Sequence, residues 1–302
     1  MEIGLGIDGR FALAEDEQRA VAREAKALGY TSLWTPIGSE PGPFDVCAAW
    51  SESAAITSGI AVAPLPSWPV DRLASVAKRT VDRTGGRFVL GVGAGRLTAS
   101  PIRAMRDASA ELRARLPGVP LYLGALGPQM LRLAGERYDG AALNWCTREQ
   151  VAWSRERVAA AARSAGRDPR EVRIHEYIRV CVDEDESAAR LALAKTVLAY
   201  ALARPGADKT KGYRAHFARM GFAGALTDLE SRRDSGASED DLAAGLPDEL
   251  LRRVGYWGRP EGAREPFVRL AEGLDIAVVR LVPGTRNDAV AVRLAMKVCA
   301  PG

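Results

Sequence analysis

The pattern with the clearest chemistry in this sequence is a run of small residues that leads into a helix-like stretch. The apolar segment Leu121–Leu123 is followed by Gly124-Ala125-Leu126-Gly127, and Pro128 opens a stretch with helical spacing. The free N–H groups and the positive dipole end of a helix that starts there can bind an anion such as a phosphate. The segment therefore predicts an anion-binding loop, and an empty turn is the alternative.

A second polar pattern lies in the predicted strand Val172–Val182. Its even positions are apolar except Glu176, and its odd positions carry Arg173, His175, Tyr177, Arg179 and Cys181. A parallel strand buried on both sides should be apolar on both faces, so the polar face is expected to line the lumen of a barrel toward its mouth. This makes His175, Tyr177 and Arg179 the candidate catalytic residues, which would orient substrate or move a proton. A hydrogen-bonded polar core without chemistry is the alternative.

Three tryptophans and one acid fall at or just beyond the ends of predicted strands: Asp8, Trp34, Trp68 and Trp145. In a parallel barrel the strand ends form the active-site face. Several large aromatic side chains on that face indicate an apolar pocket for a planar ligand or an apolar substrate. We expect these residues to line the substrate pocket.

Two glycine runs invite comparison with nucleotide-binding loops. The run Gly4-Leu5-Gly6-Ile7-Asp8-Gly9 has the spacing of a dinucleotide fingerprint, but only three residues precede it, and the fingerprint needs a whole strand there. These glycines are therefore expected inside the first strand. The run Gly91-Val92-Gly93-Ala94-Gly95 follows a strand pattern and would let a flat ligand approach the backbone, with a plain tight turn as the alternative.

Other catalytic signatures are missing from the sequence. The two histidines, His175 and His216, form no metal-ligand spacing with each other or with the cysteines, so no protein-held metal is expected. Neither a nucleophile-elbow motif nor a phosphate-binding Walker loop occurs. Few acids, bases or nucleophiles stand at predicted strand ends, which favours a site in which a cofactor performs the chemistry.

The elements that must position these residues alternate regularly along the chain. Eight strands are predicted, each followed by a helix, and this alternation is typical of an α/β protein with a closed (β/α)8 TIM barrel. An open, doubly wound sheet is the alternative. The predicted strands are Glu2–Asp8, Ser32–Trp34, Gly59–Ala63, Arg87–Val92, Pro120–Gly124, Gly140–Asn144, Val172–Val182 and Asp275–Leu281. The predicted helices are Glu15–Leu28, Phe44–Ile56, Pro69–Arg83, Pro101–Arg115, Pro128–Arg137, Arg148–Ala165, Glu184–Ala203 and Asn287–Val298.

The segment Arg204–Gly258 interrupts this alternation before the last strand and is too long for an ordinary loop. Its pattern predicts short helices over Tyr213–Met220, Leu226–Ser235 and Pro247–Val254. No linker composition separates it from the rest. We therefore expect a helical insertion, 204–258, beside the mouth of a single domain that spans residues 1–302.

Composition sets outer limits on the class of protein. The 302 residues are 47% hydrophobic and 26% charged, with a net charge of +4, which excludes disorder and a collagen-like repeat. The basic residues are scattered, so nucleic acid is not an expected partner. The four separated cysteines predict a reduced, cytoplasmic protein. No signal peptide is expected at the first residues, and without a run of 18 apolar residues no contact with a membrane is expected.

Several segments together resemble the luciferase-like monooxygenase superfamily, which includes flavin-dependent monooxygenases and oxidoreductases that use the deazaflavin coenzyme F-420. The resemblance covers nearly the whole chain and is closest to the deazaflavin branch. The segments that carry it are Leu28–Pro36, Gly86–Gly95, Tyr122–Gly140, Asn144–Trp145, Tyr213–Phe222 and Arg280–Pro283.

The resemblance implies a flavin-type cofactor in the barrel mouth, with its phosphate on the loop after the fifth strand. Carried over to this chain, the cofactor-binding residues are Ala63, Gly93, Gly124, Ala125, Leu126, Gly127, Gln129, Met130 and Asn144. The end of the third strand, Ala61–Pro64, would support the ring system, in the family often through a non-prolyl cis peptide. Many relatives also carry a histidine or acid after the second strand, where this chain has Trp34-Thr35-Pro36-Ile37.

These implications favour an oxidoreductase that transfers a hydride between an organic substrate and the deazaflavin. FMN is the alternative cofactor, with a monooxygenase as the corresponding function, and a non-catalytic flavin-binding barrel is a further alternative. The deazaflavin carries an anionic tail that must leave the mouth. The segment Arg96–Gly118, which is shorter than in many relatives, would leave an opening. Arg96 and Arg103, or Lys209, Lys211 and Arg214, would supply the positive charge. The expected partners are an apolar or aromatic small molecule and a second copy of the chain in a homodimer.

Overall fold

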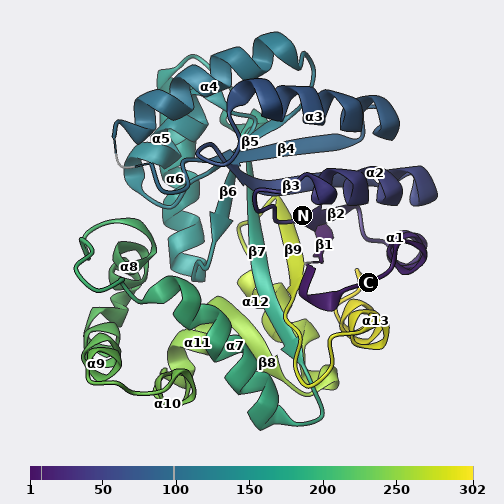
Figure 1. Ribbon diagram of the computed structural model, residues 1–302. Coiled ribbons are helices and arrows are strands. Elements are labelled where there is room, and N and C mark those ends of the chain that lie inside the picture. The colour runs from purple at the N-terminus through teal and green to yellow at the C-terminus, as the bar shows by residue number, and fades with distance from the viewer. Residues whose placement is uncertain (8, 98, 302) are drawn as a thin grey trace.

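The computed structural model describes residues 1–7, 9–97 and 99–301. Its described strands form one parallel sheet, and eight of them close into a barrel because β6 also pairs with β7 and β1 with β9 (Figure 1). The barrel strands are β1 (Glu2–Gly6), β2 (Ser32–Thr35), β3 (Thr57–Pro64), β4 (Phe88–Gly93), β5 (Leu121–Gly124), β6 (Gly140–Asn144), β7 (Arg173–Val182) and β9 (Ile276–Leu281). The predicted TIM barrel is confirmed.

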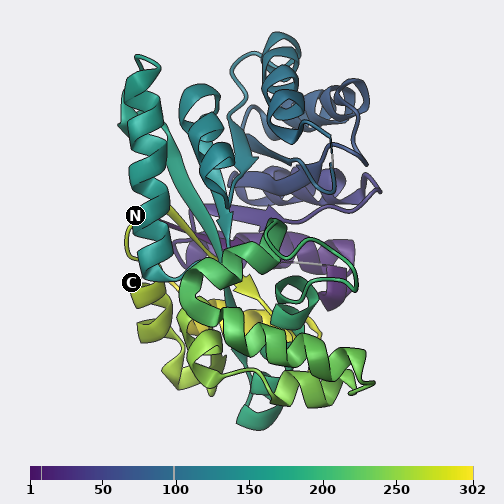
Figure 2. The ribbon, with the colours of Figure 1, turned by 90° about the vertical axis from the view of Figure 1, so that its left-hand side faces the viewer.

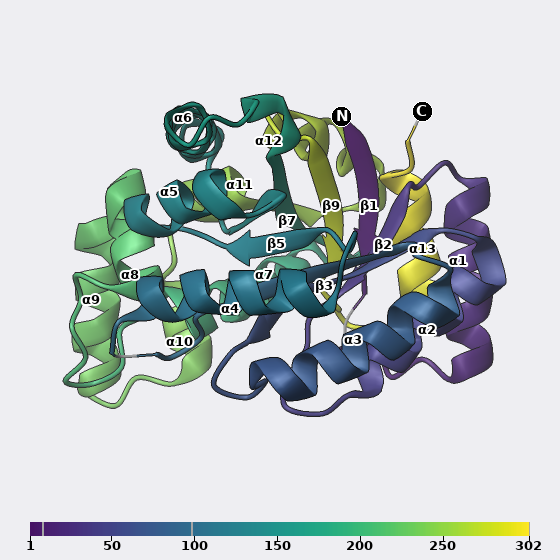
Figure 3. The same ribbon diagram turned by 90° about the horizontal axis from the view of Figure 1, so that it is seen from above.

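Helices lie outside the strands, and Figure 3 shows them following one another around the barrel. They are α1 (Glu15–Ala27), α2 (Gly42–Ala54), α3 (Val70–Thr84), α4 (Pro101–Arg115), α5 (Pro128–Arg137), α6 (Arg148–Ser164), α7 (Glu186–Ala201), α12 (Arg264–Leu270) and α13 (Ala289–Val298). Short 3-10 turns occupy Gly9–Phe11, Pro169–Glu171 and Pro260–Gly262. The main hydrophobic core lies between these helices and the strands.

Large aromatic side chains fill the barrel interior, and glycines on the neighbouring strands leave room for them. Trp34 on β2 is fully buried there, and a Cβ added at Gly59 of β3 would lie 2.4 Å from Cζ3 of its indole. A Cβ at Gly4 of β1 would lie 2.9 Å from the indole Nε1. Gly6, further along β1, leaves room for Arg280 and Tyr177 in the same way. Gly4 and Gly6 are therefore packing residues of the first strand, as predicted. The prediction is wrong for Gly9, which opens the 3-10 turn after the strand.

The insertion folds into short helices on one side of the barrel, where the green segments lie together in Figures 1 and 2. These are α8 (Gly212–Phe217), a π-helix at Ala218–Phe222, α9 (Ala223–Asp234), α10 (Glu239–Ala244) and α11 (Asp248–Val254). They share a second hydrophobic core with α7 and with Trp145. The sequence did not predict α10, α12 or the short strand β8 (Gly255–Gly258), which extends the sheet beside the far end of β7.

Within the described residues, no helix combines the length and the apolar character that crossing a membrane requires. The same residues contain no group of three histidine, cysteine or acidic side chains arranged to hold a metal ion.

Candidate functional site

A bulge at the end of β3 shapes one side of the barrel mouth. Pairing between β3 and β4 shifts register between Ile60 and Ala63, and the peptide between Ala61 and Val62 is cis. The Val62 side chain lies over a floor of glycines, since a Cβ added at Gly93 or Gly124 would lie 2.9 or 3.2 Å from its Cγ2. The glycines thus make room for the Val62 side chain at the ends of β3, β4 and β5, where the family resemblance implies support for a ring system.

The loop between β5 and α5 exposes unused backbone donors. Its first N–H, from Ala125, donates to the carbonyl of Ala142, and Leu131 N–H donates to the carbonyl of Gly127. Among the described residues no protein acceptor takes the N–H groups of Leu126, Gly127, Gln129 or Met130. A Cβ at Gly127 would meet nothing within 4 Å. A helix N-terminus with open space before it suits a phosphate.

An arginine that sequence reasoning did not select lies at this loop. Nη2 of Arg219, in the π-helix of the insertion, donates to the carbonyl of Leu126 at 2.9 Å. The side chain is exposed and has no ion pair among the described residues. Arg219 therefore places a positive charge beside the free N–H groups. The sequence segment Tyr213–Phe222 contained this residue, but nothing in its spacing indicated that it would return to a loop 93 residues earlier.

Four of the five basic residues expected around a cofactor tail form ion pairs with acidic residues of the chain. Lys209 and Arg214 both bind the carboxylate of buried Glu230, at 2.7 and 2.8 Å. Lys211 pairs with Asp208, and Arg103 pairs loosely with Asp107. Those pairs serve the structure of the insertion and of α4. Arg96 is exposed in the loop after β4.

Arg179 and Asn144 form a polar junction at the ends of β7 and β6. The Arg179 guanidinium lies 4.0 Å from the ring centroid of Trp145 and donates to the side-chain oxygen of Asn144 and to the carbonyl of Tyr177. Asn144 in turn donates to the hydroxyl of Tyr213 at 2.7 Å. Burial lowers the pKa of Arg179 to about 10, and the neighbouring charge of Arg280 adds to this effect. The guanidinium nevertheless remains charged at neutral pH.

His175 and Trp34 lie deeper, inside the barrel. Their ring centroids are 4.3 Å apart, and Tyr122 and Tyr177 also contact the imidazole. Both ring nitrogens of His175 lack a hydrogen-bond partner among the described residues, and burial lowers the pKa of His175 to about 3. Such a neutral, enclosed imidazole fills space. Of the three residues selected on this strand, Tyr177 and Arg179 are the ones that contact groups at the strand ends.

A buried acid-thiol-imidazole cluster behind β6 was also not predicted as a site. Cys146 N–H donates to Glu176 Oε1 at 2.6 Å, and Cys146 Sγ lies 3.8 Å from His216 Nε2. His216 Nε2 donates to the carbonyl of Trp145 at 2.8 Å, which fixes the insertion to the end of β6. Burial raises the pKa of Glu176 to about 8 and also raises the pKa of the Cys146 thiol. The thiol is therefore protonated and not a nucleophile.

The other residues predicted to line the mouth lie apart from one another in the structure. Trp145 packs under the insertion against Arg179 and Tyr200. Trp68 lies outside the barrel, where its ring packs on Phe44 and its Nε1 donates to the carbonyl of Gly38. Ala63 points into the outer core as well. Asp8 lies outside the described residues.

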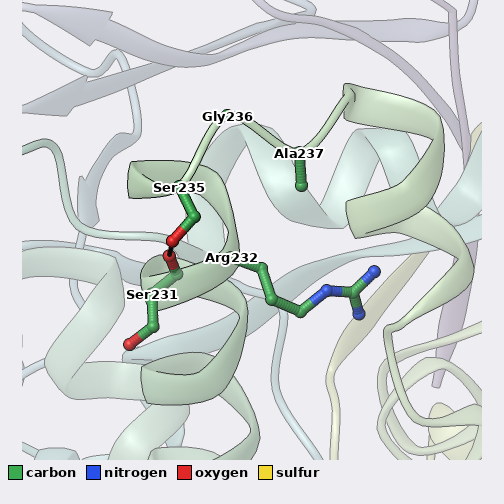
Figure 4. A pocket seen from close by; sticks show the side chains of 5 residues that line it. All are labelled: Ser231, Arg232, Ser235, Gly236 and Ala237. Carbon is green, nitrogen blue, oxygen red and sulfur yellow. Dashed lines mark hydrogen bonds between the residues drawn. The ribbon is translucent and has the colours of Figure 1, made fainter.

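A surface hollow lies at the turn between α9 and α10. Figure 4 shows the residues that line it: Ser231, Arg232, Ser235, Gly236 and Ala237. The Ser235 hydroxyl donates to the carbonyl of Ser231, and Arg232 donates to the carbonyl of Asp241. Its polar groups thus bind the local backbone. Both serine hydroxyls donate to backbone carbonyls, and none of the five lining residues is a histidine or a carboxylate that could activate them. The barrel mouth remains the candidate site.

Comparisons with known proteins identify the family and the fold. The family model described as luciferase-like monooxygenase matches residues 98–275. The chain is 26% identical to 5,10-methylenetetrahydromethanopterin reductase of Methanolobus tindarius, over 87% of this chain and 88% of the relative. Among solved structures, the coenzyme F-420-dependent tetrahydromethanopterin reductase from Methanopyrus kandleri superposes with a TM-score of 0.76 at 16% identity, covering 98% and 97% of the two chains. An F-420-dependent secondary alcohol dehydrogenase, solved with an F-420-acetone adduct, gives a TM-score of 0.71 at 15% identity, covering 100% and 99%.

Proposed function

The chain belongs to the luciferase-like monooxygenase family, and from that premise we propose that it transfers a hydride between an organic substrate and the deazaflavin coenzyme F-420. Its class is that of the luciferase-like oxidoreductases. The proposal concerns the cofactor, the reaction and the residues that serve them.

The observation that carries the proposal is the unused donor set of the loop before α5. Four backbone N–H groups, from Leu126, Gly127, Gln129 and Met130, have no protein acceptor among the described residues, and open space faces Gly127. Arg219 adds a cation beside them. Together these groups fit a phosphate. We assign the planar ring to the end of β3, where Val62 lies over Gly93 and Gly124.

Two arguments favour the deazaflavin over FMN. The reductase of Methanopyrus kandleri and the alcohol dehydrogenase that share this fold are both named as F-420-dependent. The deazaflavin also carries an anionic tail beyond its phosphate, and Arg219 at the loop is exposed rather than enclosed. An exposed cation can serve a ligand that leaves the mouth toward solvent.

When bound, the deazaflavin supplies or accepts a hydride, and it reacts poorly with oxygen because a ring nitrogen is replaced by carbon. The chain contributes position and charge. The loop amides and Arg219 hold the phosphate, and Val62 backs the ring system. On the opposite side of the mouth, Arg179, which stacks on Trp145, orients the substrate together with the ring of Tyr177. His175 stays neutral and enclosed, so it moves no proton.

Substitution of Gly127 by Asp tests the proposed phosphate position. The added carboxylate would lie where the phosphate binds, and repulsion between like charges in a partly dry site costs several kcal/mol. F-420 affinity, measured by fluorescence titration, should fall at least about tenfold, which corresponds to roughly 1.4 kcal/mol. Gly42→Asp is the matched control, because a Cβ at Gly42 also meets nothing within 4 Å and α2, which Gly42 opens, packs against α1 and α3 on another side of the barrel. Equal F-420 affinity in folded Gly127→Asp and in wild type would remove this loop from the site.

A further inference from the structure

The groups at the ends of β7 and β9 bear on which substrates the proposed site accepts. Arg179 and Arg280 are register partners on these adjacent parallel strands, and each is only 5% exposed. Both guanidiniums lie over the ring of Tyr177. The Cζ atom is 5.7 Å from the ring centroid for Arg179 and 5.1 Å for Arg280. Two cations are therefore held close together at the top of the barrel.

Arg179 carries its charge without a neutralising carboxylate. Its guanidinium donates hydrogen bonds to two neutral oxygens, the side-chain oxygen of Asn144 and the carbonyl of Tyr177. No ion pair joins it to any of the described carboxylates, and Glu176 on the same strand binds the amide of Cys146 instead. A guanidinium has five N–H donors, so the two recorded acceptors leave capacity unused. Burying a charge that lacks an opposite charge is costly, and such positions are enriched in binding sites.

Flat aromatic surfaces surround this guanidinium. The ring centroid of Trp145 lies 4.0 Å from Cζ of Arg179, and that of Tyr200, on α7, lies 5.9 Å from it. Tyr200 is 36% exposed, so this wall reaches the protein surface. Tyr213 packs edge-on against Tyr200, with ring centroids 4.8 Å apart. Aromatic rings therefore border the guanidinium on the side of α7.

We propose that the substrate of this oxidoreductase carries a carboxylate beside a flat ring, and that Arg179 binds the carboxylate while Tyr177 and Tyr200 contact the ring. The inference rests on the proposed function, because it assigns the substrate half of the same mouth. A planar guanidinium can bind a carboxylate through two parallel hydrogen bonds, which makes carboxylate the anion that fits best. The bond-making step is the hydride transfer already proposed, and the carboxylate takes no part in it.

The test compares benzoate with benzamide, a neutral molecule of nearly the same shape, by ligand-observed NMR titration. Saturating F-420 occupies the anion-binding loop, so benzoate cannot bind there. Wild type should bind benzoate at least about tenfold more tightly than benzamide. In Arg179→Gln the preference should fall to within about threefold, and Arg179→Lys should be intermediate because it keeps the charge without the planar donors. Arg157→Gln is the matched control, since Arg157 is also stacked on a tryptophan, Trp153, but on the outside of the barrel.

Equal binding of benzoate and benzamide by wild type would overturn the inference, and so would an unchanged preference in Arg179→Gln. F-420 affinity is measured on the same samples and separates the two proposals. If F-420 binds and the benzoate preference is absent, the substrate inference alone is wrong. If F-420 does not bind, the comparison is repeated in Gly127→Asp, where the loop repels anions, and a preference that disappears with Arg179→Gln still supports the carboxylate site. If Arg179→Gln does not fold, Arg179→Lys provides the comparison.

Discussion

Residues of the insertion form hydrogen bonds with loops at the barrel mouth that lie far from them in the sequence. Arg219 reaches the carbonyl of Leu126 from the insertion, and its Nη2 also lies 3.5 Å from His216 Nδ1. His216 in turn donates to the carbonyl of Trp145. The same few residues therefore attach the insertion to two loops of the barrel and bring a cation to the proposed phosphate position.

Arg219→Gln should weaken F-420 binding about tenfold at low salt, because one charge-assisted contact to the phosphate is lost. Fluorescence titration at two salt concentrations measures the effect, and the wild-type affinity should fall more steeply with salt than that of the variant. Arg132→Gln is the control, since Arg132 lies on α5 near the same loop but pairs with Glu136 and faces solvent. Equal losses in both variants would assign the effect to general surface charge.

Glu176 should make the stability of the protein depend on pH. Burial raises the pKa of Glu176 to about 8, against about 4.5 in an unfolded chain. Between these values the folded state binds the proton and the unfolded state does not, so stability falls as pH rises through this window. Glu176→Gln lacks the titration, and its stability relative to wild type should increase by at least about 1 kcal/mol between pH 5 and pH 8. Urea unfolding of both proteins across this range measures the difference, and parallel curves would show that Glu176 does not bind a proton in the folded state.

At the scale of elements, the sequence predicted the barrel well because two periodicities alternate without interruption as far as α7. Strands and helices such as Gly140–Asn144 and Pro128–Arg137 were predicted with their observed ends, since glycine, proline and charged residues mark them. β8 was missed because Gly255-Tyr256-Trp257-Gly258 is only four residues long and continues a helical segment. The loop donors at Leu126–Met130 were predictable from strand-loop-helix order. Arg219 and Glu176 were not, because tertiary contacts give them their roles.

Gly59→Ala tests whether the barrel interior is as tightly filled as the structure indicates. The new Cβ would lie 2.4 Å from Cζ3 of Trp34, which is enclosed and cannot move freely. Overpacking of this kind costs roughly 1–3 kcal/mol of unfolding free energy. Gly42→Ala, at the start of α2, is the control because its Cβ would meet nothing within 4 Å. A loss no larger than that of the control, measured by urea unfolding, would contradict the described packing of Trp34.

Glu230→Ala should loosen the insertion while leaving the barrel folded. The carboxylate accepts from Arg214, Lys209 and the N–H of Ala203, and its removal leaves the buried Arg214 guanidinium without an anion. Breaking a buried pair costs about 3–5 kcal/mol. Hydrogen exchange should therefore accelerate over residues 203–234 and remain slow in the barrel strands. Asp240→Ala, which removes the exposed partner of Lys195, is the control, and slow exchange in both variants would refute this role of Glu230.

At the scale of the whole molecule, the barrel and the insertion divide the proposed work between them. At the ends of β3, β4 and β5, Val62 lies over Gly93 and Gly124, and the loop before α5 presents backbone donors. The insertion adds Arg219 to that loop and adds Tyr213 to the Arg179 junction on the other side. In the proposed function, cofactor and substrate would meet between the sheet and the helical insertion, which contacts both proposed sites.

The choice of cofactor is the central claim, and competition between F-420 and FMN for the wild-type protein tests it most directly. Fluorescence titrations at low salt give the affinity for each cofactor alone, and displacement of one by the other establishes that they share a site. The account predicts that F-420 binds at least about tenfold more tightly than FMN, and that added salt reduces this preference because the anionic tail contributes to it. Equal affinities at low salt, or a protein that purifies with stoichiometric yellow FMN, would contradict the account and favour a monooxygenase that uses FMN.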